Sequence, residues 1–251
     1  MHLPKLPGRV HHCKTSTLSV VLILSGLTSL LFSCEGPEIN YERYYFQTDH
    51  FFDPKVYVYR NIMKKDDHTY WEMSTVKVDD EEIFITKIYS NDMHRQEELH
   101  EWMDKNGSKV IKYFVFEQKD STDEKVNCEI TRDEVIKWNM EKGKEIAWEI
   151  NFKSLIQTGS TVTISKTREA IATSASFSFL GNKYGCILFQ DSYQILSSNQ
   201  TGHSSNEYKY SAASYYAKGI GLVEFHQRFS DGNEKHYKLE KIVSAEEFWK
   251  E

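Results

Sequence analysis

The sequence predicts an all-β fold, either a single curved antiparallel sheet or an open half-barrel of hairpins, and a sandwich also fits. One or two short helices accompany the strands, and a signal peptide precedes them. Short runs rich in β-branched and aromatic residues follow one another along most of the chain, which is typical of strands. Several runs alternate apolar and polar residues, so each such strand buries one face. Clusters of Gly, Asn and Asp separate the runs, as hairpin turns require.

Residues 1–33 are expected to be a secretory signal peptide. Lys5, Arg9 and Lys14 precede Thr17–Phe32, an uncharged run of 16 residues. This run is shorter than the about 20 apolar residues of a transmembrane helix. A basic start, a short apolar run and small residues at its end are typical of secretory signals. A buried core helix is the alternative, but its place at the extreme N-terminus disfavours that interpretation.

The end of this run, Leu31-Phe32-Ser33-Cys34, resembles a bacterial lipobox. The resemblance implies that Cys34 becomes the first residue of the mature protein and carries the acyl chains, such as palmitate. Each buried CH₂ contributes ~0.8 kcal/mol, so a triacylated cysteine holds a protein on a membrane without a spanning helix. Residues 34–50 would then form the lipidated cysteine and its tether, and residues 51–251 the β domain. The expected location is the bacterial cell envelope, facing the periplasm or the cell surface.

Charge excludes one class of partner. Removing residues 1–33 leaves 218 residues and takes the net charge from −6 to −9, because that segment carries three basic and no acidic residues. Nucleic-acid binding needs a basic patch, so no nucleic-acid partner is expected. The 15 Tyr, 14 Phe and five Trp residues can supply a substantial core, since each aromatic side chain buries about 150–250 Å².

The expected strands follow from these runs in chain order. Asn106-Gly107 lies between two apolar runs and predicts a type I′ hairpin, which needs two residues at positive φ. Residues 230–233 predict a second hairpin turn. The stretch 92–101 is charged and fits a helix or a strand. The strands are expected at residues 55–60, 70–78, 82–89, 100–103, 109–117, 145–152, 161–165, 171–179, 184–190, 207–217, 222–229 and 235–242.

Two segments look helical. Residues 132–140 follow Thr131, a possible N-cap with Glu134 three residues later. Residues 244–251 begin with Ser244 and Glu247 in the spacing of a capping box. We therefore expect one short helix inside the β domain and one at its C-terminal end.

The cysteines leave one question open. Cys13 would leave with the signal peptide and Cys34 would be lipidated, so Cys128 and Cys186 remain as a possible disulfide in an oxidising compartment. Two separate buried thiols are the alternative, because free cysteine behaves as a small apolar residue. Their spacing does not match a zinc site, and neither a metal nor a cofactor is expected.

The C-terminal third resembles a known group of proteins. Residues 179–187 (FLGNKYGCI) look like a tight turn feeding a buried strand, and residues 215–224 (YYAKGIGLVE) precede the last hairpin. These elements are similar to those of uncharacterised bacterial envelope lipoproteins, which are distantly like half-barrel carriers that hold a lipid on a concave sheet. The resemblance implies an antiparallel β domain and no catalytic residues. Gly219 and Gly221 are expected to bend the strand or to let another strand approach closely.

Three groups of residues could carry chemistry. Gly202-His203-Ser204 resembles an incomplete esterase elbow, without the strand-to-helix context that the elbow needs. His94 and His100, with Glu97, Glu98 and Glu101 between them, hint at a metal site, although a solvated charged face fits better. His226 and His236 are expected across the final hairpin, on one face with Glu224 and Arg228. None of them completes a catalytic motif, so no enzyme is expected.

The sequence therefore predicts a membrane-anchored lipoprotein that binds or scaffolds. Its expected partners are the membrane, through the lipid anchor, and an apolar or amphiphilic ligand such as a lipid, or an envelope protein. A purely structural or assembly lipoprotein is the alternative, and a hydrolase is a third.

Overall fold

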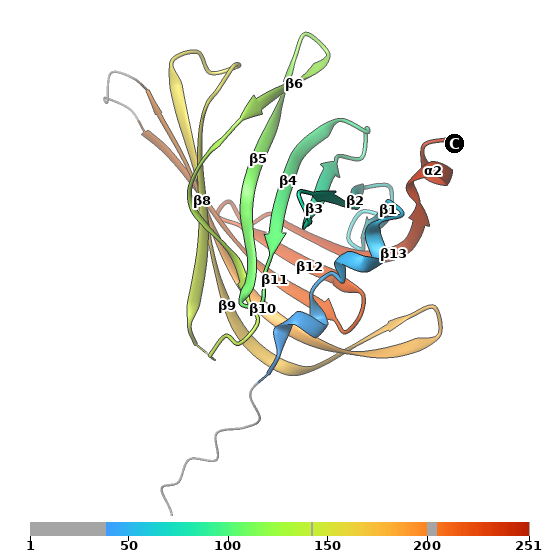
Figure 1. Cartoon of the computed structure of the whole chain (residues 1–251). Helices are drawn as coiled ribbons and strands as arrows, with labels where there is room; N and C mark the ends of the chain where they lie inside the picture. Colours follow the sequence, from blue (N-terminus) through green and yellow to red (C-terminus); the bar gives the residue numbers. More distant parts are fainter. Residues whose placement is uncertain (1–38, 142, 200–204, 251) are drawn as a thin grey trace, which may run out of the picture. The chain divides into compact units, whose positions relative to one another are not determined.

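The computed structural model describes residues 39–141, 143–199 and 205–250, without the side chains of residues 172–174 and 205. In this part of the chain thirteen strands form one antiparallel sheet (Figure 1). They are β1 (Lys55–Asn61), β2 (His68–Val78), β3 (Glu81–Tyr89), β4 (Arg95–Met103), β5 (Gly107–Lys119), β6 (Thr122–Asn127), β7 (Glu129–Lys137), β8 (Glu145–Lys153), β9 (Ser160–Phe179), β10 (Asn182–Asn199), β11 (Ser205–Ala217), β12 (Gly221–Phe229) and β13 (Glu234–Ser244).

The sheet closes into a barrel. The strand order is β4-β3-β2-β1-β13-β12-β11-β10-β9-β8-β7-β5-β6, and β4 also pairs with β5. Twelve strands therefore form a ring, and β6 extends β5 beyond it as a hairpin. The all-β class is confirmed, but the expected open sheet or half-barrel is wrong. Closure removes the exposed edges that an open sheet would leave.

Strand β5 joins the two ends of the ring. It pairs with β4 over most of its first half and with β7 through Gly107, Ser108 and Lys109. A Cβ atom on Gly107 would lie 2.1 Å from the carbonyl oxygen of Ile136. Only glycine permits this close approach of two backbones. The sequence pattern shows Gly107 as a turn residue, whereas the structure also uses it to close the barrel.

The hairpin at Asn106-Gly107 is confirmed, but its predicted turn type is wrong. Neither residue has a positive φ; the Asp104 carboxylate instead accepts hydrogen bonds from the backbone N–H groups of Asn106 and Gly107. The paired positive φ values of a type I′ turn occur at Asp79-Asp80, Asp120-Ser121 and Leu180-Gly181. The turn at residues 104–107 thus uses an Asp side chain that bonds the nearby backbone, which is an alternative to a type I′ turn.

The helix predictions divide. The helix predicted at residues 132–140 is wrong, because most of that segment belongs to β7, which pairs with β8 and buries Val135 and Ile136. The C-terminal helix is confirmed as α2 (Ala245–Phe248), and the Ser244 hydroxyl accepts a hydrogen bond from the N–H of Glu247. The ambiguous stretch 92–101 contributes to strand β4, and the strands expected at 161–165 and 171–179 are one strand, β9. None of the described helices is long and apolar enough to cross a membrane.

The segment before β1 fills one end of the barrel. It forms two short 3-10 helices, η2 (Tyr41–Tyr44) and η3 (Thr48–Phe51), and buries Tyr41, Tyr45, Phe46 and Phe51. The Phe46 ring stacks on Phe84 at 5.4 Å and the Tyr45 ring on Tyr216 at 5.7 Å, measured between centroids. Residues 39–50, which the sequence analysis placed in the tether, are thus part of the core. We call residues 39–52 the plug.

Gly219 and Gly221 both have positive φ, 75° and 96°. A Cβ atom on Gly221 would lie 2.3 Å from the Phe46 ring, whereas one on Gly219 would meet nothing within 4 Å. Gly221 therefore provides both a strained backbone conformation and the space that the plug occupies. The close approach expected from the sequence is confirmed, but the approaching group is an aromatic ring and not a strand.

This pair gives a matched stability test. We expect Gly221→Ala to lower the free energy of unfolding by about 2–4 kcal/mol, because it combines backbone strain with overpacking. Gly219→Ala should cost about 1 kcal/mol, from the backbone alone. Urea denaturation of the two variants measures the difference. Equal losses would show that Phe46 does not pack against this strand.

Candidate functional site

The barrel interior holds a cavity of about 280 Å³ above the plug. Its wall consists of side chains that alternate with outward-facing ones on the strands that surround it. Polar groups from β2, β4, β12, β13 and the β1–β2 connection complete the lining, among them Asp67, Thr69, Glu97 and Gln227. The aromatic part of the wall is formed by Trp71, Tyr113, Trp148, Tyr193, Tyr210, Phe225 and Tyr237. The lining thus combines aromatic faces with many polar groups, which can together hold and orient a small ligand.

A layer of buried charges separates the cavity from the plug. Arg168 on β9 and Asp191 on β10 form a bidentate pair, with Nε–Oδ1 at 2.7 Å and Nη2–Oδ2 at 2.9 Å. The Ser214 hydroxyl donates to Asp191, and Lys166 Nζ lies 3.1 Å from its Oδ2 atom. Burial opposes ionisation of Asp191, but Arg168 and Lys166 outweigh it and hold the pKa of this carboxyl well below its usual range.

The other members of this layer are less completely paired. Glu101 accepts hydrogen bonds from the hydroxyls of Tyr45, at 2.8 Å, and Ser108, at 2.5 Å, and burial raises its pKa. Burial and the nearby Arg168 lower the pKa of Lys166 to about 8. The plug thus contributes Tyr45 to the charged layer, which ties the position of the plug to that of the cavity floor.

Glu97 brings a carboxylate to the cavity wall. It lies on β4, on the same face of the strand as Glu101. The Tyr113 hydroxyl donates to its Oε2 atom at 2.5 Å. Burial raises the pKa of Glu97, while the Tyr113 hydrogen bond and the charge of Lys166 lower it in part. A carboxylate in this position can accept further hydrogen bonds or pair with a cation inside the cavity.

Trp71 brings an unused donor to the same wall. Its ring packs against Tyr59 and Phe225, with centroids 5.3 and 5.8 Å apart. Its Nε1 atom is buried and has no hydrogen-bond partner among the described residues. A buried donor left without a partner costs about 1–3 kcal/mol, so a bound molecule that accepts from this N–H would recover that energy.

A second hollow, of about 580 Å³, lies over strands β9 to β12. It is larger, but its lining consists mainly of residues that alternate with the inward-facing ones, including Ser165, Thr167, Ser211 and Arg228. Both buried polar atoms without a partner among the described residues, on Trp71 and Arg168, belong to the interior. We therefore take the cavity inside the barrel as the candidate functional site.

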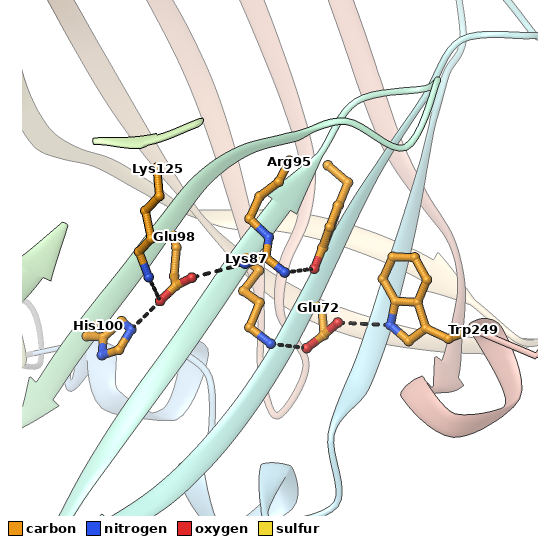
Figure 2. A network of polar contacts seen from close by, with 8 residues as sticks. Glu72, Lys87, Arg95, Glu98, His100, Lys125 and Trp249 are labelled. Carbon is orange, nitrogen blue, oxygen red and sulfur yellow. Dashed lines mark hydrogen bonds and ion pairs between the residues drawn. The ribbon is translucent and has the colours of Figure 1, made fainter. Parts of the chain in front are cut away.

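Strand alternation divides the charged group predicted around His94 and His100. Glu97 and Glu101 face the interior, whereas Glu98 and His100 face outward. Figure 2 shows the outward network: Glu98 contacts Lys125 Nζ at 3.0 Å and His100 Nε2 at 2.8 Å. His94 bonds Asp123. No cluster of three or more metal-ligating side chains occurs in the described part of the chain.

The same outer wall holds the C-terminal helix. Glu72 on β2 bonds Lys87 on β3 at 2.5 Å and the indole N–H of Trp249 at 2.9 Å (Figure 2). The Trp249 ring also contacts Tyr89, with centroids 5.0 Å apart. These polar groups satisfy one another and fasten the residues around α2 to the barrel, so they serve the fold.

The predicted pairing of His226 and His236 is confirmed. They are opposite each other in β12 and β13, and their rings stack at 4.9 Å. His226 bonds Glu234 at 3.0 Å and His236 bonds Glu224 at 2.8 Å. The Nε2 atom of each ring thus already has a carboxylate partner, and the pair lies on the outer face, away from the cavity.

The remaining predicted residues divide between described and undescribed parts. Cys128 and Cys186, for which the sequence left a disulfide open, are both buried free thiols. Burial raises their pKa values to about 12 and 11, which makes them poor nucleophiles. Cys13, Cys34 and residues 200–204 lie outside the described residues, so the signal peptide, the lipobox and the incomplete esterase elbow have no structural counterpart here.

Sequence reasoning missed the interior residues. Lys166 and Arg168 lie two apart on β9, and Asp191 lies in a stretch of β10 beyond the strand expected at residues 184–190. Charged residues at alternate positions of a strand are the sequence pattern that is typical of its solvent-facing side. The available indication was that Asp191 directly follows the nearly continuous apolar run at residues 184–190, which suits a buried ion pair as well as a strand end.

Comparison with protein-family models gives no match, and comparison with curated proteins gives none. Solved structures give weak similarity. A "putative lipoprotein" from Parabacteroides distasonis aligns with a TM-score of 0.44 and 13% identity, over 80% of this chain and 98% of its own. A "putative exported protein with YmcC-like fold" from Bacteroides fragilis gives 0.45 and 12%, with the same coverage. The "hypothetical lipoprotein YmcC" from Escherichia coli gives 0.32 and 12%, over 93% and 99%. These scores are too low to carry a functional argument.

Proposed function

We propose that this protein is a lipid-anchored envelope lipoprotein whose barrel binds a small ligand in the interior cavity and does not catalyse a reaction. The observation that carries the proposal is the buried Trp71 N–H, which has no partner among the described residues and belongs to a side chain that lines the cavity. Buried polar groups are almost always paired, so this exception points to a molecule that binds there.

The architecture supports entry from one end only. The plug fills the other end, and the layer of Arg168, Asp191 and Glu101 lies between plug and cavity. The residues near the mouth come from the β1–β2 and β3–β4 connections, such as Asp67 and Asn91. Binding is preferred over catalysis because the carboxylate of Glu97 has a tyrosine hydroxyl as its neighbour and not a nucleophile.

The anchor rests on the sequence. A basic N-terminus, the apolar run Thr17–Phe32 and the lipobox-like residues up to Cys34 support export and acylation. An anchored barrel would present its ligand site close to a membrane, in the periplasm or at the cell surface.

A cavity-filling substitution tests the binding site. We expect small organic solutes to bind the purified full chain in a ligand-observed NMR screen, and Ile164→Trp to abolish that binding because Ile164 lines the cavity. Thr163→Trp is the matched control, since the neighbouring residue on β9 points the other way and its hydroxyl bonds Asn151 on β8. Binding that survives Ile164→Trp, or its absence from all three proteins, would contradict the proposal.

A further inference from the structure

The ionisable groups inside the barrel do not balance. Below the residues near the mouth, three carboxyl groups, Glu97, Glu101 and Asp191, face two basic groups, Lys166 and Arg168. Both basic groups contact the same partner: Arg168 forms the bidentate pair with Asp191, and Lys166 lies 3.1 Å from it. The interior therefore has a formal excess of one negative charge.

This excess is located at the cavity wall. Glu101 lies beneath the wall and is held by the hydroxyls of Tyr45 and Ser108. Glu97 faces the cavity, accepts one hydrogen bond from Tyr113, and forms no ion pair with any described side chain. Lys166 is close enough to act on Glu97 through its charge, but its ammonium group is paired with Asp191. A carboxylate removed from water gains most from a cation bound beside it.

The rest of the wall suits an organic cation. Faces of Trp, Tyr and Phe rings attract ammonium groups through the ring quadrupole, and more strongly when water is excluded. Trp71, Trp148, Tyr193, Tyr210 and Phe225 supply such rings to the cavity that the carboxylate faces. A metal ion would instead need several oxygen or nitrogen ligands, and the described residues hold no such cluster.

The Trp71 N–H adds a second requirement. This N–H is a hydrogen-bond donor that has no acceptor among the described residues. We therefore expect the ligand to carry an oxygen that accepts its hydrogen bond. We infer that the cavity binds a small organic ammonium ion with a hydroxyl or ester oxygen, held by Glu97 through its charge and by Trp71 through its oxygen. This inference rests on the proposed function and names its ligand class.

Two basic residues near the mouth could oppose a cation. Lys235 is exposed, so solvent screens its charge. His68 lies 3.5 Å from Glu240 on the outer side of the mouth. Asp67, which also lines the cavity, accepts hydrogen bonds from Asn61 and Tyr237 and adds a negative group on the same side. The charged groups near the mouth therefore do not cancel the negative charge of Glu97.

A pair of probes with the same shape tests the charge. Choline and 3,3-dimethyl-1-butanol differ in that a neutral carbon replaces the ammonium nitrogen. We expect choline to bind the purified full chain about tenfold more tightly or better, as a charged partner should, measured by calorimetry. Glycerophosphocholine is titrated in parallel, because the same ammonium occurs free and in lipid headgroups; the tighter of the two identifies the source.

Two variants locate the effect. Glu97→Gln should remove the preference for choline while leaving the affinity for the neutral alcohol unchanged. Glu98→Gln removes a charge from the next residue of β4 but on the outer face, and should keep the preference. Since the probe pair already decides the matter in the unmodified protein, poor folding of a variant does not remove the test.

The outcomes separate the two proposals. A neutral alcohol that binds as tightly as choline, or a preference that survives Glu97→Gln, overturns the ammonium inference and leaves the binding cavity standing. The ammonium inference also fails, and the binding cavity stands, if neither probe binds while other solutes bind and Ile164→Trp abolishes their binding. If no solute binds at all, both the inference and the proposed function fail.

Discussion

Replacing Arg168 with methionine should lower the free energy of unfolding by about 3–5 kcal/mol, because it leaves the carboxylate of Asp191 buried without its main partner. Arg168 is 3% exposed and Asp191 is fully buried, so water cannot replace the lost contacts. Lys166 remains beside Asp191 at 3.1 Å and limits the loss. Urea denaturation at neutral pH measures the change.

Two controls make this expectation specific. Arg228→Met removes the same side chain from an exposed pair with Glu234, at 3.2 Å, and should cost no more than about 1 kcal/mol. Replacing both partners, Arg168→Met with Asp191→Leu, should recover much of the loss, since no uncompensated charge remains at position 191. A loss at Arg168 no larger than at Arg228 would show that the buried pair does not hold the barrel together.

The same pair sets a pH dependence. Since the pKa of Asp191 lies well below its usual range in the folded protein, its pairing stabilises the fold above the pKa of an ordinary carboxyl group. That contribution is lost as the pH falls toward the folded-state pKa. The difference in stability between the unmodified protein and Arg168→Met should therefore shrink in acid. A difference that grows as the pH falls would contradict this assignment.

Replacing Cys34 with alanine should move the protein from the membrane fraction to the soluble fraction. The lipobox-like sequence around Cys34 supplies the anchor in this account, and without acyl chains no other strong attachment is expected from an acidic chain. Immunoblotting of the two fractions after cell lysis measures the shift. Cys13→Ala, a substitution inside the expected signal peptide, is the control and should leave the protein on the membrane. Unchanged retention of Cys34→Ala would exclude the anchor.

Local sequence patterns predicted much of the fold. Alternating runs identified strands such as β8, the turn residues 230–233 identified the last hairpin, and Ser244 with Glu247 identified α2. In each of these cases neighbouring residues determine the structure. The helix predicted at residues 132–140 is wrong. Thr131 and Glu134 are compatible with a helix cap as well as with a strand, and only the pairing with β8 decides in favour of a strand.

Barrel closure and the cavity depend on contacts that local patterns do not record. Glu97 pairs in register with Val115, while the cavity it faces also needs Trp71 and Tyr210 from strands far along the chain. Glu97 and Glu98 look alike in the sequence, yet strand alternation places one in the cavity and the other in the outer network. The plug was missed for the same reason, because residues 39–50 resemble a tether until their aromatic rings meet Phe84 and Tyr216.

The plug, the charged layer and the cavity form one connected interior. Tyr45 of the plug donates to Glu101, and its ring stacks on Tyr216, whose hydroxyl accepts from Arg168 at 3.2 Å. Displacement of the plug would therefore disturb the cavity floor.

The central claim, that a ligand occupies the cavity beside Trp71, is tested most directly by NMR of the indole N–H groups in the ¹⁵N-tryptophan-labelled protein. Trp138 donates to the Asp104 carbonyl at 2.7 Å and Trp249 to Glu72, both outside the cavity lining, so they serve as internal references. On addition of the tightest-binding solute, the account predicts that the Trp71 N–H resonance moves while those of Trp138 and Trp249 stay. A Trp71 resonance that stays fixed while the solute binds would contradict it.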